Sequence, residues 1–92
     1  MPKFLTTHVT SCMTRQDVEK LTKRFLAESS GDIKIQRVQC DTLEGRMICE
    51  WEAPDKETLV GWLEKRNVRF RSDQEWAIRV QMETRDGKIV VL

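Results

Sequence analysis

Four segments with strand periodicity and two segments with helical spacing follow one another along this chain in a fixed order. Alternating or β-branched segments cover residues 3–9, 33–41, 46–53 and 75–83, and helical spacing follows Thr14 and Asp55. The order is therefore β-α-β-β-α-β. It constrains the fold to an α+β domain, because helices and strands that are interleaved in this way must share one core.

The first helix has the clearest pattern. Thr14 is expected to be its N-cap, with Asp17 three residues later in a weaker version of the capping box. The apolar residues that follow recur at i, i+3, i+7 and i+8, which predicts one buried stripe composed of Val18, Leu21, Phe25 and Leu26. The second helix opens at Pro54 and Asp55, and its apolar face is predicted to contain Leu59, Trp62 and Leu63.

The strands carry their own signals. The alternation in residues 33–41 slips by one position, which predicts a β-bulge near Gln36 and Arg37. Residues 75–83 alternate strictly, and Asp86 and Gly87 then predict a hairpin turn to a short final strand at 89–92. A split βαβ arrangement satisfies this order. We therefore expect a ferredoxin-like βαββαβ fold, with two helices on one face of an antiparallel sheet ordered 4-1-3-2 and a short C-terminal hairpin strand.

Both faces of this sheet are expected to carry apolar side chains. In the third strand, Met47, Cys49 and Trp51 are expected on one face and Ile48 on the other. In the first strand, Leu5 and Val9 are expected on one face and Phe4 on the other. Only one face can lie against the helices, and a sheet that is apolar on both faces usually has both covered. The simplest partner is a second copy of the chain, so we expect a homodimer joined through the open face.

Length and charge exclude several classes of function. The chain has 92 residues, which fits a single domain over residues 1–92, and its 16 Lys and Arg residues nearly balance 15 Asp and Glu residues. This balance provides no long-range field to attract nucleic acid or a membrane surface. No apolar run is long enough to span a bilayer and no signal-peptide pattern is present, so we expect a cytoplasmic protein. Cys12, Cys40 and Cys49 lack CxxC spacing, and we expect them to be reduced thiols.

Three stretches of the sequence resemble a known family. They are the opening Met1 to Leu5, the helix start Thr14 to Asp17, and the segment Met47 to Asp55 (MICEWEAPD). Together they are similar to the group of small bacterial and archaeal proteins catalogued as domain of unknown function 4242. The resemblance covers about the first two-thirds of the chain. It implies a ferredoxin-like fold, commonly a dimer, and some relatives are described as nickel-binding or nickel-responsive.

The predicted topology gathers candidate metal ligands at one rim of the sheet. The ends of the first two strands and the start of the fourth share that rim, which would hold His8, Cys12, Asp41 and Glu75, with Met13 beside them. Imidazole, thiolate and carboxylate are ligands that nickel and other divalent transition metals accept. The alternative is that His8 is an ordinary edge residue and that the carboxylates are solvated turn residues.

Other functions remain open at this point. A cofactor-independent enzyme of the dimeric α+β barrel type would use Glu50 in a pocket between the sheet and its partner, with His8 as an optional second group. Glu50 would lie near Arg79 if the strand register permits. The alternative for Glu50 is a cross-strand ion pair. The basic cluster Lys65, Arg66, Arg69 and Arg71 would hold a phosphate or carboxylate, or else complement the C-terminal end of the second helix. An interaction module without any site is a third possibility. We expect a binding protein rather than an enzyme, and we assign no catalytic residues.

Overall fold

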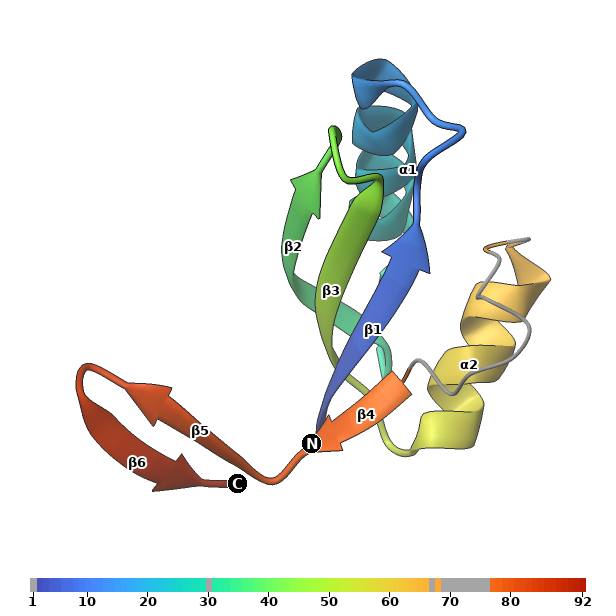
Figure 1. Cartoon of the computed structure of the whole chain (residues 1–92). Coiled ribbons are helices and arrows are strands. Elements are labelled where there is room, and N and C mark those ends of the chain that lie inside the picture. The colour runs from blue at the N-terminus through green and yellow to red at the C-terminus, as the bar shows by residue number, and fades with distance from the viewer. Residues whose placement is uncertain (1, 30, 67, 69–76) are drawn as a thin grey trace.

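The computed structural model describes residues 2–29, 31–66, 68 and 77–92. Along the chain the elements are β1 (Lys3–Val9), α1 (Arg15–Glu28), β2 (Lys34–Asp41), β3 (Arg46–Glu52), α2 (Lys56–Lys65), β4 (Ala77–Val80), β5 (Met82–Arg85) and β6 (Lys88–Val91) (Figure 1). The structure is α+β, as predicted. Its main sheet is antiparallel with the order β2-β3-β1-β4, which is the predicted order 4-1-3-2 counted from the opposite edge.

Helix α1 begins as the sequence predicts. The Asp17 backbone N–H donates to Thr14 Oγ1 at 3.1 Å, and the Thr14 N–H donates to Asp17 Oδ2 at 3.0 Å, which completes a capping box. Val18 and Phe25 are buried, but Leu26 is 61% exposed, so its predicted place in the buried stripe is wrong. Adjacent helical residues differ by about 100° in direction, and once Phe25 is aimed at the sheet Leu26 is turned toward solvent.

The core lies on one face of the main sheet. Trp51 of β3 is completely buried there, with its ring centroid 5.2 Å from Phe25 of α1 and 5.4 Å from Trp62 of α2. Leu59 and Leu63 of α2 are also buried in this cluster, as predicted. Because residues of both helices share one core with inward residues of β1 and β3, both helices cover the same face (Figure 1). Neither of them is long and apolar enough to cross a membrane, within the part of the chain that is described.

The register of β1, β2 and β3 confirms the two-faced pattern. Phe4 lies opposite Trp51 on the helix face, and Thr7 lies opposite Ile48 on the open face. The register of β2 against β3 shifts between Ile35 and Arg37, so the predicted bulge is confirmed.

The predicted strand over residues 75–83 is wrong in its second half. Strand β4 pairs with β1 only as far as Val80, which lies opposite Lys3, the first residue of β1. Pro2 precedes Lys3 and has no backbone N–H to offer, so the ladder stops there. Glu75 and Trp76 lie outside the described residues.

Residues 82–91 instead form a separate two-stranded sheet, which extends away from the main sheet as an arm (Figure 1). Its strands meet at a turn in which Asp86 has φ 51° and Gly87 has φ 75°, as the predicted hairpin requires. The predicted element order is therefore not matched after α2, where the described residues form three short strands instead of the expected two.

Two glycines provide a matched test of this backbone. Gly45 has φ +70°, and a Cβ added there would lie 2.8 Å from Ser11 Cα, whereas a Cβ on Gly61 in α2 would meet no heavy atom within 4 Å. We expect Gly45→Ala to lower the free energy of unfolding by about 2 kcal/mol, because it adds left-handed strain to a backbone clash. Gly61→Ala should raise it by about 0.5–1 kcal/mol through helix propensity. Urea denaturation measures both, and equal effects would contradict the described turn.

Candidate functional site

A pocket of about 390 Å³ opens where the end of β1 meets both helices. We call it the His8 pocket, and the described residues that line it are His8, Val9, Thr10, Cys12, Met13, Leu21, Arg24, Arg66 and Val68. Most of its wall is apolar, with a few polar groups that converge from different elements. Pockets of this size and character are the usual form of a small-molecule site.

His8 lies at the outer end of a buried chain of hydrogen bonds that begins at Trp51. The Trp51 indole N–H donates to Thr6 Oγ1 at 2.9 Å, and Thr6 Oγ1 lies 2.9 Å from His8 Nε2. Since Thr6 already accepts from Trp51, its own hydroxyl hydrogen can be donated to His8 Nε2, which requires a neutral imidazole. The alternation of β1 explains this chain, because Thr6 and His8 both face the helices.

Burial keeps His8 neutral. Its side chain is removed from water, and this desolvation lowers the pKa of His8 from 6.5 to about 4. At neutral pH the pocket therefore has no positive charge from His8. The imidazole is instead a polar group that is fixed by its bond to Thr6.

Thr10 continues the inward-facing series of β1 and is only 3% exposed. Its backbone N–H donates to Gly45 O at 2.7 Å, but its buried hydroxyl has no hydrogen-bond partner among the described residues. A buried hydroxyl without a partner costs about 1–3 kcal/mol. Thr10 also lines the pocket, so a molecule bound there would lie next to this residue.

Two guanidinium groups also line the pocket, and both are tied to Glu28 of α1. Arg24 Nε donates to Glu28 Oε2 at 2.8 Å, and Arg66 Nε donates to Glu28 Oε1 at 2.9 Å. The hydrogen bond from Arg24 is the main reason that the pKa of Glu28 lies below its usual value, so Glu28 stays ionised. The Arg66 guanidinium also lies over the Trp62 ring, 3.7 Å from its centroid.

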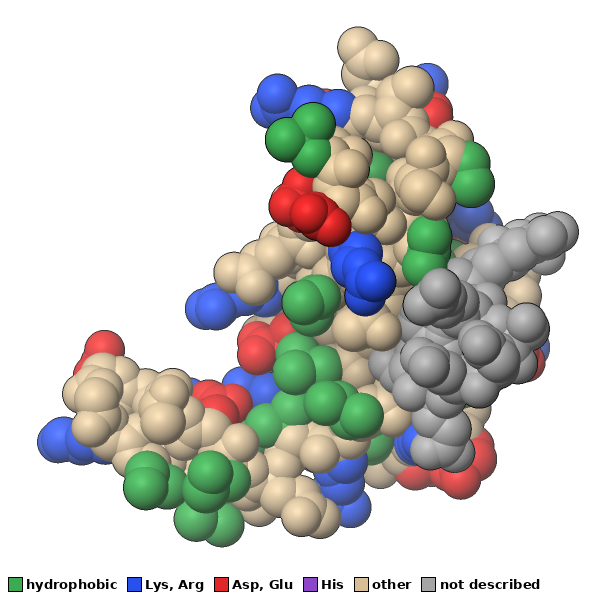
Figure 2. Space-filling view, viewed as in Figure 1, with side chains coloured by type: hydrophobic (Ala, Val, Ile, Leu, Met, Phe, Trp, Pro, Cys, Tyr) green, Lys and Arg blue, Asp and Glu red, His purple; other side chains and the backbone are tan. Residues whose placement is uncertain are grey.

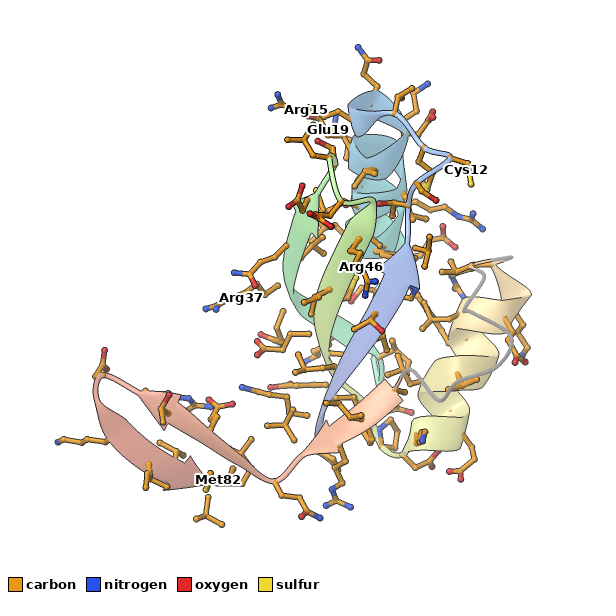
Figure 3. All side chains as sticks on the ribbon, viewed as in Figure 1. Cys12, Arg15, Glu19, Arg37, Arg46 and Met82 are labelled. Atoms are coloured by element: carbon orange, nitrogen blue, oxygen red, sulfur yellow. The ribbon has the colours of Figure 1, made fainter. Side chains whose placement is uncertain are left out.

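The predicted metal residues are only partly brought together. His8 and Cys12 line the same pocket, and Cys12 is exposed on the β1–α1 loop (Figure 3). Asp41 lies on the open face opposite Arg46, and its Oδ1 accepts from the Leu43 and Glu44 N–H groups at 2.9 and 3.1 Å. Glu75 is outside the described residues.

The two sides of the sheet explain this separation. Cys40 pairs with Met47 on the helix face, and the next residue, Asp41, must point the opposite way. His8 and Asp41 thus share a rim but not a face. No group of three or more His, Cys, Asp or Glu side chains placed to hold a metal ion occurs among the described residues.

The remaining thiols differ in reactivity. Cys40 is exposed, whereas Cys49 is completely buried, and desolvation raises the pKa of Cys49 to about 12. A thiol with this pKa is neither a nucleophile nor a ready metal ligand at neutral pH. All three cysteines are free in the structure.

The enzyme hypothesis placed Glu50, with His8 as an optional second group, in one pocket, and the register puts these two residues on opposite faces of the sheet. Glu50 lies opposite Leu5 on the open face, whereas His8 lies opposite Met47 on the helix face. The neighbour of Glu50 is Lys3, whose Nζ lies 3.6 Å from Glu50 Oε1. The predicted neighbour Arg79 is wrong, because it lies opposite Phe4 on the other face.

Sequence reasoning identified Arg66 as part of a basic cluster but did not identify Thr10 or Arg24. Lys65 is exposed at the end of α2, and Arg69 and Arg71 lie outside the described residues. Thr10 could have been found by extending the inward alternation of β1 by one step. For Arg24 the only signal was Glu28 four residues later, a spacing that usually indicates a surface ion pair.

Comparison with known proteins adds no assignment. No family model matches the chain, and neither a curated protein nor a solved structure matches it.

The lowered pKa of His8 predicts a specific pH dependence of stability. Below pH 6.5 the unfolded chain binds a proton at His8, whereas the folded chain does not until about pH 4. The free energy of unfolding should therefore fall as the pH drops through this window, by about 3 kcal/mol in all. Urea denaturation at several pH values measures the slope, and NMR follows the single histidine directly.

The matched control is His8→Gln, which should remove the slope between pH 5 and 6.5, above the range in which the carboxylates titrate. A folded-state His8 pKa near 6.5, or an unchanged slope in the variant, would contradict the buried position.

Proposed function

We propose that this protein is a small homodimeric binding protein of the ferredoxin-like type, which holds its ligand in the His8 pocket. The observation that carries the binding role is the concentration of buried polar groups, His8 and the Thr10 hydroxyl, in an otherwise apolar pocket. The strand order β2-β3-β1-β4 and the shared helix face support the ferredoxin-like assignment. Membership of the family catalogued as domain of unknown function 4242 is part of the same proposal.

The open face of the sheet supports self-association. Val9, Ile48 and Ile78 are exposed there by 43%, 44% and 57%. Figure 2, which looks onto this face, shows hydrophobic side chains grouped over the sheet and a second group on the arm. Isolated exposed apolar residues are ordinary, but a group on one flat face is typical of an interaction surface.

The charges around these residues also suit a second copy. The register places Lys34, Glu52 and Lys3 in one row across the open face, and Arg37 and Glu50 in the next row. Arg37 and Arg46 project from β2 and β3 in Figure 3. A face that carries both signs can meet itself around a twofold axis with unlike charges opposite each other. This complementarity favours an identical partner over an acidic or basic one.

A pair of substitutions tests the dimer. We expect Ile48→Lys to raise the dimer dissociation constant at least tenfold, because burying the new ammonium in the interface costs more than about 1.4 kcal/mol. The matched control is Leu43→Lys, because Leu43 is 98% exposed in the β2–β3 turn, away from the proposed interface. Sedimentation over a range of protein concentrations measures both. A wild-type chain that stays monomeric at every concentration would reject the homodimer.

Binding of a transition metal, nickel or another divalent ion, is a second candidate function. It is favoured by one observation, that His8 and Cys12 line the same pocket, with Met13 beside them. An imidazole nitrogen and a thiolate are suitable donors, but such sites generally have three or more protein ligands. A metal ion in this pocket would therefore need a further donor, from Glu75 or from a second copy.

The cysteines offer a matched test of the metal. We expect calorimetric titration with nickel or zinc to show binding that Cys12→Ala weakens at least tenfold, since it removes the soft ligand. Cys40→Ala is the control, because Cys40 is also an exposed thiol but lies outside the His8 pocket. Equal effects of the two variants, or no binding tighter than roughly 10 µM, would remove the metal from consideration.

A further inference from the structure

We propose that the His8 pocket binds a small organic carboxylate, an anion with an apolar body. This inference rests on the proposed binding role and names the chemical class of the ligand. Arg24 and Arg66 are the only charged side chains among the described residues that line the pocket. Guanidinium groups are the side chains best suited to recognise a carboxylate, because they offer paired N–H donors in a plane.

The charge at this wall is unbalanced. Glu28 neutralises one guanidinium charge, since it binds Nε of both Arg24 and Arg66, and this leaves one net positive charge among the described residues of the wall. Burial holds His8 neutral, so it adds nothing. A cation would meet this positive charge, whereas a carboxylate would complete the balance.

The two guanidinium groups are also held in place. Arg66 stacks on Trp62 and donates from Nη1 to Trp62 O at 3.0 Å, and Arg24 donates from Nη1 to Arg66 O at 3.3 Å. Together with their bonds to Glu28, these contacts use two of the five N–H groups of each guanidinium. A ligand that bonds the others loses little side-chain entropy, because the arginines are already ordered.

Thr10 provides a second observation that does not depend on charge. Its hydroxyl is buried in the pocket wall, and no described residue accepts or donates a hydrogen bond to it. A carboxylate has enough lone pairs to accept from a guanidinium and from a hydroxyl at the same time. A bound carboxylate that reaches Thr10 would therefore give its hydroxyl a hydrogen-bond partner.

The rest of the wall indicates what the carboxylate is attached to. Met13, Leu21 and Val68 line the pocket with apolar surface, and Met is a side chain that adapts to ligands of different shape. A purely inorganic anion would leave this surface in contact with water. An aliphatic or aromatic acid would cover it, and the pocket of about 390 Å³ is large enough for a small one.

The test uses the full chain and three probes of one shape. Hexanoate, hexylamine and hexanamide share an apolar body and differ in charge, and nickel chloride is the fourth arm. Shifts of the Thr10, Met13 and Leu21 amide signals in NMR spectra report binding. We expect hexanoate to bind at least tenfold more tightly than either other organic probe.

Variants then separate a binding role from a structural one. Arg24→Gln should weaken hexanoate binding about tenfold, and Lys20→Gln, which removes the same charge elsewhere on α1, should change it less than twofold. Thr10→Val should weaken binding several-fold while raising the melting temperature by a few degrees, because it replaces an unpartnered buried hydroxyl with a methyl group. A merely structural Thr10 would lower the melting temperature instead.

Each remaining outcome overturns the inference. Equal binding of the three organic probes would show an unselective apolar groove. Nickel that shifts the pocket signals, and binds more tightly in Arg24→Gln, would assign the pocket to a cation. Sedimentation of the same samples tests the homodimer independently of the ligand. If hexanoate does not bind but the dimer is intact, this inference alone is rejected.

Discussion

The rest of this structure depends on the packing of the buried Trp51 indole. Its ring packs against both Phe25 of α1 and Trp62 of α2, so one side chain of β3 joins both helices to the sheet. An aromatic side chain of this size is a major part of the core of so small a domain. Its N–H, however, cannot be buried without a partner, and Thr6 on the neighbouring strand provides one. The polar atoms of the helix face therefore begin at the centre of the core and not at its edge.

From there the alternation of β1 carries polar groups outward. Thr6, His8 and Thr10 occupy successive inward positions, so the strand delivers hydrogen-bonding atoms to the rim where the helices diverge. Hydrogen bonds join Trp51, Thr6 and His8 in sequence, whereas no described residue bonds the Thr10 hydroxyl. The same rim receives Arg24 from α1 and Arg66 from the end of α2. Core packing and pocket chemistry are thus consequences of one strand.

The sequence predicted most of the sheet but only part of the site, and the difference has a physical origin. The helix caps, the bulge before Arg37 and the Asp86–Gly87 turn depend on local chemistry, which a single sequence displays directly. The extent of β4 depends on where its partner strand ends, and the pattern of residues 75–83 contains no information about Pro2. Leu26 was placed wrongly for a similar reason, since the stripe of α1 is decided by the exact direction of Phe25.

The site required contacts between distant segments. Because the ends of the first two strands share a rim, the sequence predicted that His8 and Asp41 lie close together. In the structure they lie on opposite faces of the sheet. Arg24 and Arg66 are 42 residues apart, and only the packed helices show that Glu28 joins them. His8 was identified correctly as a rim residue, yet its neutral state follows from burial that no pattern in one sequence could specify.

Lys3 links the arm to the main sheet through two ion pairs. Its ammonium lies 2.7 Å from Glu83 of the arm and 3.6 Å from Glu50 of the sheet, so two acids of different bodies share one cation. The three side chains are only 15–24% exposed, so salt screens these pairs less than it would screen fully exposed ones. Lys3 is thus the one residue of β1 whose ion pairs reach both the sheet and the arm among the described residues.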